Sequence, residues 1–256
     1  MSSALTASEI AATLGQRPCR AYPALLSTEA QAMAWARGGA ASGALVVADY
    51  QASPRGRGGL PWIATPGRGL GFTLVTRPDL APEREGWPYV PASLAIAEVF
   101  GDAEVEWPDT VVSAGGGRPL ARLGVYVELG PGRTEWATIN VLVDEVDPPR
   151  AALLGRLVAA LEQRLLDDAE IVVEAYRERC ATLGRQVRAR MIPMGIDGPE
   201  VNGEAVDVLA DGSLVVLTAR GNRVAVPPQN LGLLEDPQIP PDLPDDIRRR
   251  LEEDPA

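Results

Sequence analysis

The chain has 256 residues, a hydrophobic content of 46 % and a formal net charge of −11. Its length suits one large domain, or one medium domain with a small appendage. The negative charge argues against a protein that coats nucleic acid, and no apolar run reaches the ~18–20 residues needed to span a bilayer. We therefore expect neither nucleic acid nor a membrane as a partner.

Two common catalytic side chains are missing from this sequence. It contains no histidine and no lysine, so all 24 basic residues are arginines. Histidine is the usual acid–base group near neutral pH, and lysine is the usual compact cation for a phosphate or carboxylate. With only Cys19 and Cys180 as thiols, we expect two reduced cysteines and no structural metal. Residues 1–16 lack the pattern of a signal peptide, so a cytoplasmic protein is predicted.

The N-terminal half of the sequence predicts alternating helices and strands. Residues 7–14 predict a short helix that ends at Gly15, and residues 27–38 predict a second helix with Ser27 or Thr28 as its cap. The further predicted elements are a buried strand at 44–48, a strand at 71–76, a helix at 91–100 that starts with proline, and strands at 123–129 and 135–143 joined by a Gly-Pro-Gly turn.

The C-terminal half begins with helices and ends as β-structure. Amphipathic helices are predicted at 148–166 and 169–180. After Gly184 the sequence predicts strands at 185–191, 203–209, 213–218 and 223–227, with tight-turn signals at Asp211-Gly212 and Gly221-Asn222. This meander suits a small SH3-like barrel. The domain prediction is therefore 1–183, then 184–235, followed by an acidic, Pro-rich tail at 236–256 that is predicted to be disordered.

Residues 51–77 form a basic stretch in an acidic chain, with four arginines (Arg55, Arg57, Arg68 and Arg77) and no acid. The stretch is either an anion site or a solvated Arg-rich loop, and charge alone does not separate the two. Because few apolar anchors lie between Gln51 and Leu60, we expect this loop to be mobile until an anion binds.

Six sequence blocks occur in the order of one known family. Residues 49–62 (DYQASPRGRGGLPW) follow a predicted strand and resemble acidic-x-Q-x-A-G-R-G-R-x-G-R-x-W. The others are 26–29 (LSTE), similar to an S-T-N helix start; 105–110 (VEWPDT), similar to L-K-W-P-N-D; 117–128 (GRPLARLGVYVE), similar to G-R-K-L-A-G-I-L-V-E; 138–141 (TINV), similar to G-I-N-V; and 176–187 (YRERCATLGRQV), similar to the entry into an SH3-like domain. Over roughly residues 20–235 the chain resembles the biotin protein ligase (biotin/lipoate ligase) family, in its short form without a DNA-binding domain.

This resemblance implies a set of site residues. A Gly/Arg loop after a strand can bring backbone N–H groups and guanidinium groups onto a phosphate. The resemblance assigns the adenylate contact to Arg57, with Arg55 as its loop partner. It places Ser27, Thr28, Gln51 and Gly124 in the acid pocket, Trp62 at its mouth, and Trp107, Asp109 and Asn140 in the ATP region. The alternatives are purely structural: Ser27 and Thr28 as a helix cap, Gly124 as a strand irregularity, and Trp107 as a packing residue.

The sequence departs from the family pattern at charged positions. The lysine before Trp-Pro is Glu106, and the lysine of G-R-K-L-A-G is Pro119, with Arg122 three residues later as the candidate substitute. Further departures are Glu29 for asparagine, Pro54 and Gly58 in the loop, and Asp109-Thr110 for Asn-Asp. The family reaction brings a carboxylate onto the α-phosphate of ATP, so a fixed cation carries much of the catalysis, and its loss costs ~10²–10³ in rate.

The sequence therefore predicts an α+β fold: a mixed, mainly antiparallel sheet flanked by helices, followed by an SH3-like barrel. The resemblance implies a biotin protein ligase-like protein that binds biotin or a related small carboxylate and, if active, uses ATP with Mg²⁺ and a biotin carboxyl carrier-type acceptor. Because the family lysines are absent, we expect weak or no activity. The alternative is a non-catalytic binding module for a carrier domain or another protein. An Arg122 guanidinium in the pocket favours the ligase, and Glu106 filling the pocket favours the binding module.

Overall fold

The computed structural model describes residues 5–115, 117–146, 149–193 and 198–237. The predicted disordered tail lies outside these residues from position 238 onward. None of the helices within the described residues is long and apolar enough to cross a membrane.

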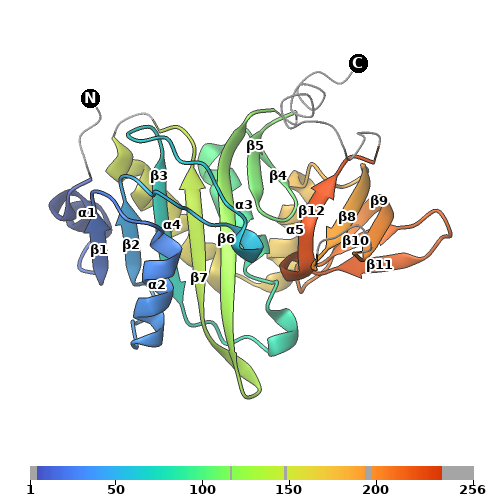
Figure 1. Cartoon of the computed structure of the whole chain (residues 1–256), viewed down its shortest axis with the longest axis horizontal. Coiled ribbons are helices and arrows are strands. Elements are labelled where there is room, and N and C mark those ends of the chain that lie inside the picture. Colours follow the sequence, from blue (N-terminus) through green and yellow to red (C-terminus); the bar gives the residue numbers. More distant parts are fainter. Residues whose placement is uncertain (1–4, 116, 147–148, 194–197, 238–256) are drawn as a thin grey trace.

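A seven-stranded sheet forms the larger part of the molecule (Figure 1). Its strands, in spatial order, are β1 (Cys19–Tyr22), β2 (Leu45–Ala48), β3 (Leu70–Thr76), β7 (Arg133–Val143), β6 (Pro119–Gly130), β5 (Thr110–Ser113) and β4 (Ala103–Glu106). Only β1 and β2 pair in parallel, and every other neighbouring pair is antiparallel. The predicted mixed, mainly antiparallel sheet is therefore confirmed.

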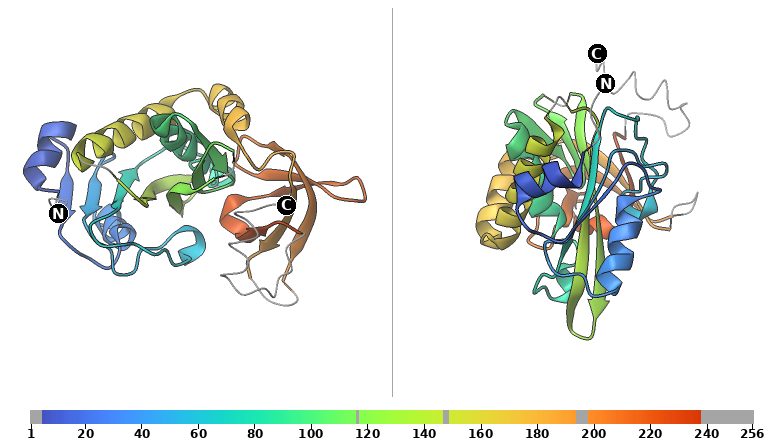
Figure 2. Two further views of the ribbon diagram at one scale, coloured as in Figure 1. Left: turned by 90° about the horizontal axis from the view of Figure 1, so that it is seen from above. Right: turned by 90° about the vertical axis from the view of Figure 1, so that its left-hand side faces the viewer.

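Helices cover both faces of this sheet (Figure 2). One face packs on α3 (Tyr89–Phe100) and α4 (Arg150–Leu166), with α1 (Ala7–Leu14) and α5 (Ala169–Arg179) beside them. The other face carries α2 (Thr28–Arg37) and the loop between β2 and β3. Side chains alternate between the faces along each strand, so the pairing register shows which residues share a face.

The register places apolar and polar side chains on opposite faces. The row Val47, Phe72, Val141 and Leu123 is fully buried under α3 and α4. On the α2 face, one row reads Ala48, Gly71, Leu142 and Arg122, and the next reads Val46, Thr73, Asn140 and Gly124. The polar and small residues therefore gather on the face that the loop covers, which is where a ligand can approach the sheet.

The C-terminal strands form a second, five-stranded antiparallel sheet. Its order is β11 (Arg223–Val226), β10 (Leu214–Leu217), β9 (Glu200–Val208), β8 (Gln186–Met191) and β12 (Leu231–Glu235). No ladder joins β11 to β12 among the described residues, so the sheet is open and the closed SH3-like barrel of the prediction is not seen. Its buried residues, such as Val187 and Leu231, belong to the same hydrophobic cluster as the main sheet.

Four short strands were missed by the sequence prediction: β1, β4, β5 and β12, each of four or five residues. They lie at sheet edges or next to them. Short runs such as Cys-Arg-Ala-Tyr in β1 show no clear alternation of apolar and polar residues. Every side chain of β1 is half-buried or exposed, as is usual in an edge strand. The predicted helices and the longer strands are all present, with ends shifted by a few residues.

Candidate functional site

A buried polar cluster joins the start of α2 to the main sheet. The backbone N–H of Thr28 donates to Oε1 of Gln51 (2.7 Å), and Oγ1 of Thr28 lies 3.0 Å from the same oxygen and 3.1 Å from Oδ1 of Asn140. Oγ1 of Thr73 lies 2.9 Å from the Thr28 hydroxyl and 3.0 Å from Asn140 Oδ1. Nδ2 of Asn140 donates to the backbone oxygen of Arg55 at 2.5 Å. The cluster therefore fixes the loop onto the sheet.

Ser27 and Thr28 differ in role. Ser27 caps α2, because its hydroxyl accepts from the Ala30 N–H at 3.4 Å. Thr28 points instead into the polar cluster. The structural alternative of a helix cap therefore holds for Ser27, and the site role of Thr28 stays a prediction.

The Gly/Arg loop lies flat on strand β6 because two glycines leave room for it. A Cβ on Gly124 would lie 3.1 Å from Cα of Gly56, and a Cβ on Gly56 would lie 2.4 Å from Nε1 of Trp62. The loop is thus held between the Trp62 indole and the sheet. Backbone bonds from Gly56 to Leu60 (2.8 Å) and from Trp62 to Pro54 (3.0 Å) close it. The loop has more anchors than the sequence predicted, and its mobility stays a prediction.

Arg57 is held away from the main cavity. Its side chain is buried, with Nε donating to Oδ2 of Asp109 at 2.8 Å and Nη1 in a close contact with the backbone oxygen of Leu231 in β12. Burial raises the pKa of Asp109, and the Arg57 charge opposes that shift. Arg55 is exposed and donates to the backbone oxygen of Gly59 at 3.1 Å. Arg57 therefore links the loop to the small sheet.

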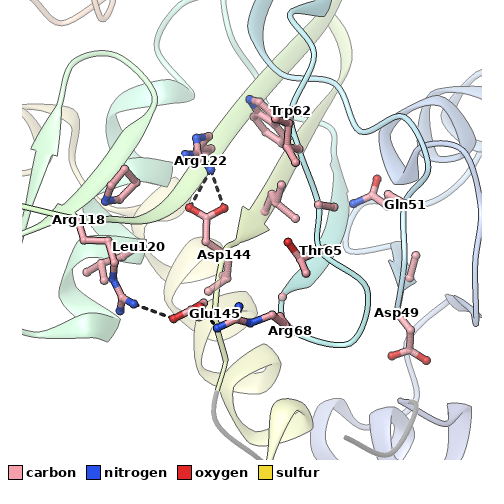
Figure 3. A pocket seen from close by; sticks show the side chains of 18 of the residues that line it. Asp49, Gln51, Trp62, Thr65, Arg68, Arg118, Leu120, Arg122, Asp144 and Glu145 are labelled. Atoms are coloured by element: carbon pink, nitrogen blue, oxygen red, sulfur yellow. Dashed lines mark hydrogen bonds and ion pairs between the residues drawn. The ribbon is translucent and has the colours of Figure 1, made fainter. Parts of the chain in front are cut away.

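A cavity of about 470 Å³ opens beside the loop, on the α2 face of the sheet (Figure 3). The row Ala48, Gly71, Leu142 and Arg122 lines it, together with Trp62, Gln51 and the segment that follows Trp62. Gln51 is 2 % exposed, and its Nε2 has no hydrogen-bond partner among the described residues. A buried amide N–H without an acceptor is costly, so the cavity offers a place for a ligand oxygen.

Three arginines face this cavity, and each contacts a carboxylate from the end of β7 (Figure 3). Nη1 of Arg122 donates to both oxygens of Asp144, at 2.6 and 2.7 Å. Arg68 and Arg118 share Glu145, and the Arg118 contact measures 2.7 Å. Burial raises the pKa of Asp144 in spite of its arginine partner. The Arg122–Asp144 ion pair therefore forms the floor of the cavity, and two arginines, Arg68 and Arg118, share one carboxylate, Glu145, at its rim.

The site residues predicted from sequence separate into three groups. Gln51, Trp62 and Arg122 line the cavity. Thr28, Asn140 and Gly124 lie directly under the loop, next to the cavity but covered. Ser27, Arg55, Arg57, Trp107 and Asp109 are outside its lining. Of the four residues predicted to share one cleft, only Gln51 lines this cavity, while Gly124 lies against Gly56 of the loop and Thr28 is buried in the polar cluster. The ligand site formed by Ser27, Thr28, Gln51 and Gly124 stays a prediction.

Two residues of the 105–110 block support the small sheet. The indole Nε1 of Trp107 donates to the backbone oxygen of Gly212 at 2.9 Å, and the Trp107 N–H donates to Thr182 Oγ1 at 2.9 Å. Glu106 contacts Arg185 at 3.3 Å and does not line the cavity. Of the two features that were expected to separate the functions, Arg122 lies in the pocket and Glu106 does not fill it.

Asp144, Glu145, Arg68 and Arg118 were not singled out as site residues from the sequence. Arg68 belongs to the basic stretch at 51–77, and Arg118 belongs to the 117–128 block. All four residues flank the ends of the neighbouring strands β3, β7 and β6. They could have been identified from the sequence only if the pairing register of these strands had been known. No group of three or more His, Cys, Asp or Glu side chains that could hold a metal ion occurs within the described residues.

Glu29 gives the fold a pH dependence. Burial at the start of α2 raises its pKa from the usual 4.5 to about 7. The folded state therefore holds this proton more tightly than the unfolded state, so the cost of burying the charge is absent below pH 4.5, grows as the pH rises, and is complete above pH 7.

We expect Glu29→Gln to stabilise the protein at pH 8 by about 1–2 kcal/mol and to have little effect at pH 4.5. Urea unfolding at both pH values measures this. Glu170→Gln is the matched control, because Glu170 is an exposed acid at the same position of α5. An equal effect of Glu29→Gln at both pH values would contradict the assignment.

Comparisons with known proteins point to one family. No protein-family profile matches the chain. A biotin–[acetyl-CoA-carboxylase] ligase of Mycobacterium tuberculosis is 29 % identical over 225 residues, which cover 78 % of this chain and 83 % of the relative. The bifunctional ligase/repressor BirA of Bacillus subtilis is 29 % identical over 99 residues, covering 37 % of this chain and 30 % of the relative.

Solved structures share the fold. The biotin protein ligase of Aquifex aeolicus, in complex with biotin and ATP, matches with a TM-score of 0.63 at 17 % identity, covering 86 % of this chain and all of that one. A biotin protein ligase-like protein of unknown function from Silicibacter matches with a TM-score of 0.61 at 12 % identity, covering 82 % of this chain and 94 % of that one. The chain is therefore similar in sequence to these ligases, and it shares the fold of the solved biotin protein ligases.

Proposed function

We propose that this chain is an ATP-dependent ligase of the biotin protein ligase type, which joins biotin or a related carboxylic acid to a carboxyl carrier protein. Support comes from the name of the mycobacterial relative and from the biotin and ATP held by the Aquifex structure. The proposed site residues are Gln51, Trp62 and Arg122 in the cavity, with Thr28, Asn140 and Gly124 as the support of the loop.

The proposed reaction has two steps. A carboxylate oxygen of the acid attacks the α-phosphorus of ATP, the bond from this phosphorus to the bridging oxygen of the β-phosphate breaks, and pyrophosphate leaves. A Mg²⁺ ion that accompanies the ATP would balance part of the phosphate charge. A lysine amine of the carrier then attacks the acyl carbon, AMP leaves, and a proton is released. In the first step two anions meet, so a positive side chain fixed at their meeting point stabilises the transition state.

One observation carries the proposal: Arg122 lies on the cavity floor, and the unpartnered Nε2 of Gln51 lies in the same cavity. Asp144 engages one nitrogen of the Arg122 guanidinium, which leaves its other N–H donors for an acid. The Gln51 amide supplies a donor for a carbonyl oxygen elsewhere on the ligand. A cavity of about 470 Å³ is in the usual range for a small-molecule site.

We further propose that the enzyme is slow. A guanidinium is broad and planar, so an arginine does not reproduce the point charge of a lysine. Arg122 also stays paired with Asp144, whose carboxylate repels an incoming acid. The competing proposal, a non-catalytic binding module, shares the acid site and differs only in the absence of adenylate formation.

We also propose that residues 1–183 form the catalytic-type domain and that 184–235 form a module related to the SH3-like domain of the family. Arg57 and Trp107 both bind backbone oxygens of the small sheet. The module therefore supports the loop and the turn between β4 and β5, and its proposed further role is to contact the carrier protein.

Isothermal titration with biotin, lipoate and octanoate, each with and without Mg-ATP, tests this function. We expect one of these acids to bind, and to support a weak but acid-dependent exchange of labelled pyrophosphate into ATP. Binding without any exchange would favour the binding module. If none of the acids binds under either condition, the proposed function is wrong.

A further inference from the structure

The arginines of the Gly/Arg loop do not face the main cavity. Arg57 is buried against Asp109 and Leu231, and the Arg55 side chain folds back onto Gly59. Neither side chain lines the cavity that Gln51 and Arg122 line. The cations that do line it, apart from Arg122, are Arg68 and Arg118.

The sheet topology brings these two arginines together. Arg68 precedes β3, Arg118 precedes β6, and Glu145 follows β7, the strand between them. In this antiparallel arrangement the start of β3, the end of β7 and the start of β6 lie at the same end of the sheet, with Leu70 paired to Val143 and Val143 paired to Ala121. Three segments far apart in sequence thus meet at the rim of the cavity (Figure 3).

The ion pairs among Arg68, Glu145 and Arg118 contribute little to the stability of the fold. The arginine side chains are 63 % and 67 % exposed, and Glu145 is 44 % exposed. Ion pairs this exposed contribute about 0–1 kcal/mol each. The ion pairs with Glu145 use one nitrogen of each guanidinium, so most of the donors of both side chains stay free for another acceptor.

The group carries a positive excess where the rest of the cavity is neutral. Two guanidinium groups share one carboxylate at the rim, whereas Arg122 is paired with Asp144 and Asp49 is paired with Arg150. In a chain with a net charge of −11, such a local excess beside a cavity favours an anionic ligand. Guanidinium groups match phosphate oxygens through paired N–H donors.

We propose that Arg68 and Arg118 form an anion subsite at the cavity rim that holds phosphate groups of the nucleotide. Glu145 holds the two guanidinium groups side by side and competes with the phosphate for their donors. This inference deepens the proposed function, since the nucleotide is the co-substrate of that function, and it moves the phosphate contact from the loop arginines to the rim.

Inorganic pyrophosphate is the probe, and isothermal titration of the full chain is the measurement. We expect Arg68→Gln/Arg118→Gln to weaken pyrophosphate binding by about 10-fold or more. Arg133→Gln/Arg156→Gln is the matched control, because it removes the same charge at two exposed positions outside the cavity and should change binding little. Thermal unfolding of each variant checks that the fold is kept.

Glu145→Gln gives the sharper test, because its sign depends on the role of Glu145. If Glu145 competes with phosphate, the variant binds pyrophosphate several-fold more tightly. Weaker binding by Glu145→Gln, unchanged binding by the double arginine variant, or no binding by the unmodified chain would each overturn the subsite.

Titration of the acid alone separates this inference from the proposed function. The double arginine variant should bind the acid as the unmodified chain does, because Arg122 and Gln51 are intact. If the chain binds pyrophosphate at the rim but binds no acid, the subsite is supported and the proposed function is wrong. If the chain binds an acid but no pyrophosphate, only the subsite is wrong.

Discussion

Replacing Arg122 with alanine is expected to lower acid-dependent exchange of labelled pyrophosphate into ATP by about 10²–10³-fold. Arg122 is the cation on the cavity floor, and no lysine exists in the chain to replace it. Arg122→Lys should keep or raise the exchange, because an ammonium group is a more compact charge than a guanidinium group, and the motif that residues 117–128 resemble has a lysine three residues before this position.

The control for Arg122→Ala is Arg164→Ala. Arg164 also contacts both oxygens of a carboxylate, that of Glu98, and the two ion pairs are similarly exposed, at 25 % and 28 % against 33 % and 25 %. It lies outside the cavity lining, so its loss should leave exchange nearly unchanged. Equal losses in both variants would show that Arg122 acts through stability, and an active Arg122→Ala variant would exclude it as the catalytic cation.

Removal of residues 185–256 is expected to unfold or aggregate the protein. The truncation strips the Leu231 oxygen from buried Arg57 and the Gly212 oxygen from buried Trp107. It also exposes the part of the hydrophobic cluster that packs on the small sheet. Arg57 keeps its ion pair with Asp109, so its loss is one hydrogen bond from a charged group, about 1.5–3 kcal/mol, and the exposed apolar surface adds to this cost.

Circular dichroism with thermal melting and size-exclusion chromatography measure this effect. Trp107→Phe is a milder companion variant, since it keeps the ring packing and loses only the indole hydrogen bond to Gly212. A truncated chain that stays folded and monomeric would contradict the structural role of the small sheet. If that chain has also lost a partner found by pull-down with the full protein, the small sheet is a binding module.

The longer elements could be predicted because their patterns are local. The apolar positions of α4 recur at helical spacing, and Leu154, Leu157 and Leu161 are all fully buried. Ser27 was recognisable as a possible cap and does cap α2. In contrast, the short strands β4 and β5 pair with each other, and β5 also pairs with β6, but four residues in each strand carry too little pattern to show this.

The site was predictable only in part, for a related reason. Gln51, Trp62 and Arg122 could be named because sequence blocks contain them. Their partners could not, since the contacts span long sequence separations: Arg68 meets Glu145 across 77 residues, and Arg118 meets it across 27. The role of Arg57 was also hidden, because its contact with Leu231 crosses 174 residues and depends on how the small sheet docks.

The most direct test of the central claim is a crystal structure of this chain with biotin. We expect difference density in the cavity, with the carboxylate of the ligand beside the Arg122 guanidinium and a ligand oxygen within hydrogen-bond distance of Gln51 Nε2. Biotin density at another place, with Arg122 still paired only to Asp144 and the Gln51 amide still without an acceptor, would contradict the account.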